Sequence, residues 1–163
     1  MKQLFFLLLA IFFITTEVKA QEVEESLSLP RMVSLRSSLI NARSGPGARY
    51  PIDWVYMQKS APVEIVAEFE LWRKVKDWDG EESWVHKAML SSLRTVKIIN
   101  LGENKIYKRP SLKSEVLALV EDGVVGEVKE CPKSKDFCLI SFGEIKGWIE
   151  KSNLFGIYPN EEI

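Results

Sequence analysis

Short apolar runs separated by turn-forming residues cover the chain from residue 30 onward. Residues 63–69 alternate between apolar and polar types for most of their length, a period that is typical of a strand with one buried face. Gly, Pro, Asp and Ser interrupt the apolar runs, and helical periodicity is nearly absent. The pattern therefore predicts an all-β fold. The other predicted strands of the first half are 32–35, 39–42, 54–57, 72–76 and 83–86.

The pattern of the first half returns after residue 93. Trp84 and Trp148 are 64 residues apart, as are Leu90 and Leu154, and a repeated offset of this kind indicates two copies of one unit. Several short strands in about 60 residues, with turns every 8–12 residues, predict a small closed or partly closed β-barrel in each copy. The expected boundaries are residues 30–92 for the first barrel, 93–158 for the second and 159–163 for a short tail.

The first 20 residues differ in kind from the rest. Lys2 supplies a positive start, residues 4–14 form an unbroken apolar run, and Ala20 ends a stretch with small or apolar residues. This arrangement predicts a secretory signal peptide over residues 1–20, with cleavage after Ala20, and a flexible leader over residues 21–29. An uncleaved membrane anchor is the alternative, but the apolar run is shorter than the ~20 residues that a spanning helix needs. The mature protein is therefore expected in the periplasm or outside the cell.

Composition and charge add little to this picture. The chain has 163 residues, of which 46% are hydrophobic, and a formal net charge of −1, values that are ordinary for a globular protein. No excess of positive charge points to nucleic acid, and no later segment is long and apolar enough to span a membrane. We therefore expect neither a nucleic-acid partner nor a stable transmembrane anchor.

Two cysteines, Cys131 and Cys138, flank six residues that are rich in turn formers. In an oxidising compartment this spacing is most simply a disulfide across the base of a hairpin. A redox or metal site is the alternative. Redox pairs favour a Cys-x-x-Cys spacing, however, and the only histidine, His86, lies far away in the sequence.

The inventory of reactive side chains does not favour an enzyme. With one histidine and no Ser/His/Asp or Cys/His spacing, no nucleophile has a base to activate it. The acidic pairs Asp77/Asp79 and Glu81/Glu82 flank Gly80, and we interpret them as solvated charges of a turn, with a calcium or acid–base site as the alternative. We therefore predict no catalytic residues, no cofactor and no metal site.

Several motifs of the chain form a recognisable set. In the first copy they are Asn41-Ala42-Arg43-Ser44-Gly45-Pro46-Gly47, Tyr50-Pro51, Trp72-Arg73-Lys74-Val75 and Trp84-Val85. In the second copy they are the cysteine hairpin, Gly147-Trp148 and residues 154–159. Together they resemble the bacterial SH3-like (SH3b) domain, in the subgroup found in exported proteins of alphaproteobacteria. Ser83 and Arg109 depart from the pattern, because each stands where a glycine is usual. The resemblance implies two tandem SH3-like barrels, and the wider family is associated with binding cell-wall peptides and peptidoglycan.

The first copy holds more aromatic residues than the core of a 60-residue barrel can bury, so some rings should lie at the surface. We expect Trp54 and Trp84 in the core. Exposed rings beside arginines would form a groove for an extended peptide or sugar chain, and its predicted residues are Arg43, Arg49, Tyr50, Trp72 and Trp78. These observations favour a non-catalytic binding module for peptidoglycan or an extended peptide. An envelope scaffold or adaptor that docks onto another protein, with no small ligand, is the alternative.

Overall fold

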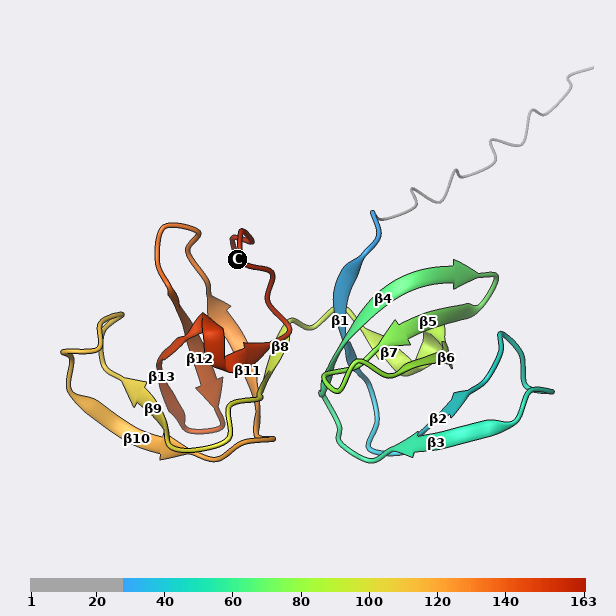
Figure 1. The fold of residues 1–163 in the computed structure, drawn as a ribbon, viewed down its shortest axis with the longest axis horizontal. Helices are drawn as coiled ribbons and strands as arrows, with labels where there is room; N and C mark the ends of the chain where they lie inside the picture. The colour runs from blue at the N-terminus through green and yellow to red at the C-terminus, as the bar shows by residue number, and fades with distance from the viewer. Residues whose placement is uncertain (1–27) are drawn as a thin grey trace, which may run out of the picture.

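The computed structural model describes residues 28–163, which form two β units side by side along the longest axis of the molecule (Figure 1). The predicted signal peptide, and the predicted leader up to residue 27, lie outside the described residues. Fourteen short strands and two single turns of 3-10 helix make up the regular structure of the described part. The predicted all-β fold is thus confirmed. Within residues 28–163, no helix is long and apolar enough to cross a membrane.

Seven antiparallel strands form the first sheet, in the order β3-β2-β6-β5-β4-β1-β7. Their bounds are β1 Arg31–Leu35, β2 Ile40–Arg43, β3 Ile52–Tyr56, β4 Pro62–Phe69, β5 Trp72–Lys76, β6 Glu82–His86 and β7 Leu90–Ser91, with the 3-10 turn η1 (Lys87–Met89) before β7. Because β1 pairs with both β4 and β7, this strand ties the two ends of the unit together.

The second sheet repeats the first, in the order β10-β9-β13-β12-β11-β8-β14. Its strands are β8 Thr95–Ile98, β9 Asn104–Tyr107, β10 Val116–Val120, β11 Val125–Glu130, β12 Phe137–Phe142, β13 Ile145–Glu150 and β14 Leu154–Phe155, with η2 (Lys151–Asn153) before β14. The first residues of β9, β10 and β14 follow those of β2, β3 and β7 by 64 positions. The offset read from the sequence is therefore the repeat of the fold.

Each unit buries a core of its own, and strand alternation decides which residues enter it. In β6 the buried residues are Ser83 and Val85, so the side chain of Trp84 between them points outward and is only half-buried. The expectation that Trp84 lies in the core was wrong, because Val85, at 0% exposure, holds the inward position. Trp54 is partly buried and packs against the core of the first unit.

Specific contacts join the two units. The Thr95 hydroxyl donates a hydrogen bond of 2.7 Å to the carbonyl of Ser60, and Val125 of the second unit packs against the core of the first. The Gln58 side-chain amide donates to the carbonyl of Gly123 at 2.9 Å. Because these partners come from the region of β3 and β4 on one side and of β8 and β11 on the other, the two sheets meet along those strands.

The disulfide between Cys131 and Cys138 is present. It joins the end of β11 to the start of β12, as the hairpin prediction required. The backbone of Cys131 also exchanges two hydrogen bonds with Ile163, of 2.7 and 3.2 Å. Arg94 forms an ion pair with Glu161, so the residues predicted to form a tail pack back onto the second unit.

Candidate binding groove at the junction of the two units

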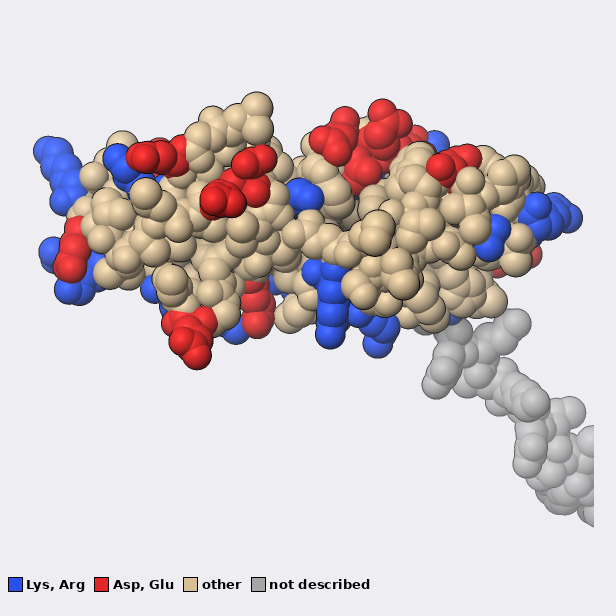
Figure 2. Space-filling view, turned by 90° about the horizontal axis from the view of Figure 1, so that it is seen from below, with Lys and Arg blue, Asp and Glu red and all other residues tan. Residues whose placement is uncertain are grey.

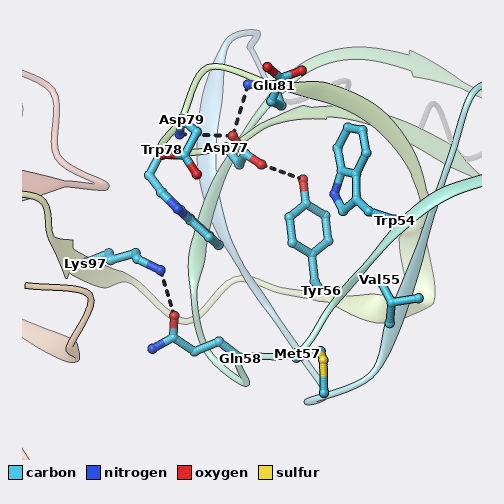
Figure 3. A pocket seen from close by; sticks show the side chains of 10 residues that line it. All are labelled: Trp54, Val55, Tyr56, Met57, Gln58, Asp77, Trp78, Asp79, Glu81 and Lys97. Atoms are coloured by element: carbon cyan, nitrogen blue, oxygen red, sulfur yellow. Dashed lines mark hydrogen bonds between the residues drawn. The ribbon is translucent and has the colours of Figure 1, made fainter.

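A groove of about 650 Å³ lies between β3 and the turn that follows β5, and one lining residue comes from the second unit (Figure 3). The rings of Trp54, Tyr56 and Trp78 line it. Alternation along β3 turns Trp54 and Tyr56 to the same side of the sheet, where the register pairs them with Ala42 and Ile40. The groove is therefore formed where the core of the first unit comes to the surface.

Asp77 fixes the turn at the rim of this groove. Its Oδ1 atom accepts hydrogen bonds of 3.0 Å from the backbone N–H groups of Asp79 and Glu81, and its Oδ2 atom accepts one of 3.2 Å from the Tyr56 hydroxyl (Figure 3). Asp77 is only 6% exposed. The interpretation of all four acidic residues of this turn as solvated was wrong for Asp77, because its carboxylate is the buried acceptor that orders the turn.

The aromatic floor of the groove is held in place by ring contacts. The ring of Tyr56 lies 6.0 Å from that of Trp54, edge to face, and 6.1 Å from that of Trp78. Burial raises the pKa of Tyr56 from 10.0 to about 12, and the nearby Asp77 carboxylate adds to the rise. Tyr56 is therefore a neutral phenol at physiological pH, whose hydroxyl donates a hydrogen bond inward to Asp77 and whose ring lines the groove.

Lys97 of β8 reaches across the junction and borders the groove from the second unit. Its ammonium nitrogen lies 3.5 Å from the centre of the Trp78 ring and donates a hydrogen bond of 2.9 Å to Oε1 of Gln58 (Figure 3). Burial lowers the pKa of Lys97, while the carboxylates of Asp79, Asp77 and Asp122 oppose that shift. The cation is thus partly desolvated and lies against the face of an indole ring.

The rest of the rim is acidic. Asp79 and Glu81 are exposed, and within the described residues neither carboxylate forms an ion pair. Figure 2 shows acidic side chains gathered on the first unit close to the junction. The groove therefore combines an aromatic floor with carboxylates and one internal cation.

The structure distributes the five predicted binding residues over three places. Trp78 lines the groove, whereas Arg43 and Trp72 line a separate hollow of about 200 Å³ beside His86. The remaining two lie in the loop after β2, where the Arg49 guanidinium lies 5.3 Å from the centre of the Tyr50 ring. Arg43 also donates a hydrogen bond of 2.7 Å to the carbonyl of Tyr50. The structure therefore does not bring the five residues together in one groove.

Sequence reasoning missed Tyr56 and Lys97 as groove residues. The alternation of Trp54 and Tyr56 along a strand was visible, and it could have placed both rings on one face. No sequence signal marks Lys97, because it belongs to the other copy and reaches the groove only through the packing of the two units. Within residues 28–163, no group of three or more His, Cys, Asp or Glu side chains is placed to hold a metal ion.

Comparison with known families fits this architecture. The family model described as the bacterial SH3 domain matches residues 36–92 and, a second time, residues 102–156. The chain belongs to the bacterial SH3 domain family. Both matches fall on the two seven-stranded units, so we call these units the first and second SH3 domains. Domains of this family are typically binding modules. No curated protein matches the chain.

Two solved structures from Trichomonas vaginalis are similar to the chain at a low level. NlpC2 is 18% identical with a TM-score of 0.34, and the match covers 80% of this chain and 49% of that one. NlpC1 is 16% identical with a TM-score of 0.34, and covers 79% of this chain and 46% of that one. The chain thus spans about half the length of these proteins, and similarity at this level says nothing about its function.

Proposed function

We propose that the protein is a non-catalytic binding module of the cell envelope that takes an extended peptide, such as the stem peptide of peptidoglycan, into the groove at the domain junction. The observation that carries this proposal is the cluster of Trp54, Tyr56 and Trp78, in which the Tyr56 ring contacts both indole rings and all three line a groove of about 650 Å³. Ligand sites are typically concave and lined by aromatic rings, with a few polar groups that fix orientation.

The rigidity of the groove supports a binding role. Asp77 ties the turn to β3 through Tyr56 and accepts from the backbone N–H groups of Asp79 and Glu81, so the rings and the backbone of the acidic turn are held before a ligand arrives. A preorganised site loses little conformational entropy on binding. An extended chain can lay apolar side chains on the rings while its backbone N–H groups donate to the carboxylates at the rim.

The disulfide supports a location outside the cytoplasm. Bonds such as that between Cys131 and Cys138 form and persist in oxidising compartments. The predicted signal peptide points the same way. A module in the periplasm or outside the cell would meet peptidoglycan directly.

Retention on purified sacculi tests the proposed function. The exported protein and its Trp78→Ala variant are mixed with sacculi, and the bound fraction is measured after sedimentation. We expect Trp78→Ala to lower the bound fraction severalfold while the second domain stays folded. Trp84→Ala is the matched control, because Trp84 is a half-buried tryptophan of the same domain that does not line the groove. Equal retention of wild type and Trp78→Ala would overturn the proposal.

One observation favours the adaptor role as a second candidate. Strand β10 lies at the edge of its sheet and exposes Val116, Leu117 and Leu119. An exposed apolar edge strand is a template for pairing with another protein. If the protein is an adaptor, Leu119→Lys abolishes its cross-linking to an envelope protein. Leu101→Lys, at an exposed leucine outside β10, should leave the cross-link intact.

A further inference from the structure

We infer that Lys97 occupies, in the free protein, the place in the groove where the ligand puts a cationic group. The inference rests on the proposed binding role of the groove, and it adds the chemistry of the ligand: an extended peptide that carries an ammonium or guanidinium group. In this view Lys97 is an internal competitor, held by the second domain, that the ligand displaces from Trp78.

The contacts of Lys97 are those of a bound cation. Its nitrogen lies 3.5 Å from the centre of the Trp78 ring, a distance at which a cation is attracted to the ring face. An ammonium group has three donors, and among the described residues Lys97 donates one hydrogen bond, to Gln58. An incoming cation can therefore take over the ring face, and Lys97 can recover hydrogen bonds from water when it leaves.

Carboxylates border both hollows that adjoin Trp78 and Lys97. Asp79 and Glu81 line the groove itself. A second hollow of about 440 Å³ lies on the other side of Trp78 and Lys97 and is lined by Asp79 and Asp122. The ionisable groups that act on the Lys97 ammonium are the three carboxylates of Asp77, Asp79 and Asp122. One cation among these acids leaves negative charge uncompensated.

The negative charge of the residues that line the groove decides which ligand charge the groove favours. A ligand carboxylate at Trp78 would enter the groove that Asp79 and Glu81 line, and like charges repel. A ligand cation would gain the same carboxylates and the ring face. The sequence had placed two cationic side chains, those of Arg43 and Arg49, in the predicted groove. Neither arginine lines this groove.

An internal competitor lowers the observed affinity in a defined way. The protein binds its ligand only in the fraction of molecules whose site is open, so the observed dissociation constant is the intrinsic one divided by that fraction. Lys97 is attached to the chain beside the site and competes at a high effective concentration. Removal of its charge should therefore tighten the binding of a cationic ligand, although the same substitution removes a contact seen in the structure.

Calorimetric titration with two synthetic probes tests the inference. One probe is a capped peptide of alternating glycine and lysine, and the other has glutamate in place of every lysine. We expect the lysine peptide to bind the exported protein. Lys97→Met should bind this peptide roughly fivefold more tightly than the wild type, and Lys97→Arg should resemble the wild type.

The double variant Asp79→Asn, Glu81→Gln should bind the lysine peptide about tenfold more weakly than the wild type, because the attracting charges are gone. Glu144→Gln, at an exposed acidic residue of the second domain, is the matched control and should have no effect.

Two outcomes would overturn the inference. Lys97→Met could bind the lysine peptide no more tightly than the wild type, or the glutamate peptide could bind the wild type and lose affinity in Lys97→Met. The proposed function fails separately from the inference. If sacculi retain the protein through Trp78 but Lys97→Met gains no affinity for the lysine peptide, the binding role stands and the competitor role of Lys97 is wrong. If Trp78→Ala changes neither retention nor peptide binding, both are wrong.

Discussion

The hydroxyl group of Tyr158 in the second SH3 domain donates a hydrogen bond of 2.8 Å to the carboxylate of Glu64 in the first. The Thr95 hydroxyl makes a parallel link to the carbonyl of Ser60. The region after β14 thus reaches back to β4 of the other domain. The two domains are joined by directional contacts as well as by the connecting chain, so the geometry of the junction groove depends on both.

Replacement of Tyr158 with phenylalanine tests this link. Tyr158→Phe removes the hydrogen bond to Glu64 and keeps the ring, and a half-exposed bond of this kind contributes about 1 kcal/mol. We expect the free energy of unfolding in urea to fall by about that amount. Tyr50→Phe is the control, because the Tyr50 hydroxyl forms no hydrogen bond within residues 28–163. Equal stability of Tyr158→Phe and wild type would show that the link does not hold the domains together.

The loop after β2 gives a second prediction through its two glycines. A Cβ atom added at Gly45 would lie 2.4 Å from ring carbon Cδ1 of Tyr50, whereas one added at Gly47 would lie 3.3 Å from the same ring. Gly45→Ala must push the Tyr50 ring away, at a cost of about 1–3 kcal/mol. We expect Gly45→Ala to lower the thermal midpoint of the first domain clearly, and Gly47→Ala much less. Equal effects of the two substitutions would contradict the observed packing of the ring on Gly45.

The sequence allowed prediction of the fold to a large extent. Strand alternation, turn residues and the 64-residue offset are local or periodic signals. The two sheets have the same strand order, as these signals predict. The burial of Trp84 was predicted wrongly because its size alone suggested a core position. The register of β6 gives the inward positions to Ser83 and Val85. Hydrophobicity indicates that a residue can be buried, and only the register decides which face it takes.

The candidate groove was less accessible to prediction than the fold. Trp78 was selected as an exposed ring on a turn, and it does line the groove. The arginines drew attention because they stand close to aromatic residues in the sequence, yet Arg43 is directed to the carbonyl of Tyr50. Lys97 comes from the other repeat, and its position depends on how two folded domains pack. That packing has no periodic signature in a single sequence.

The disulfide gives a third prediction. It closes a loop between residues 131 and 138, and closure of such a short loop contributes roughly 2–3 kcal/mol to stability in the chain-entropy model. We expect Cys131→Ala, Cys138→Ala to speed hydrogen exchange in β11 and β12 and to leave β4 and β5 of the first domain nearly unchanged. Hydrogen exchange with mass spectrometry on peptides from each domain measures this difference. Equal acceleration in both domains would contradict it. Titration of the unfolded, unreduced wild type should find no free thiol.

Tyr56 gives the last prediction, through its pH dependence. Burial raises the pKa of Tyr56 from 10.0 to about 12 in the folded protein, so between these values the folded state keeps a proton that the unfolded state has lost. The Tyr56 phenol therefore makes its full contribution to the free energy of unfolding below about pH 10, and this contribution is lost as the pH rises toward 12. The difference between these two values corresponds to about 2–3 kcal/mol of unfolding free energy.

Tyr56→Phe isolates this contribution from those of other groups. At neutral pH the variant should be less stable by about 1–3 kcal/mol, because the Asp77 carboxylate loses a donor. As the pH rises from about 10 to 12, the wild type alone loses the contribution of the phenol, so the gap between the two proteins should shrink by about 2–3 kcal/mol. The depressed pKa of Lys97 acts in both proteins and cancels in the difference. Urea unfolding of both proteins at matched pH values measures the gap. A gap that stays constant up to about pH 12 would show that the Tyr56 phenol is not held neutral against Asp77.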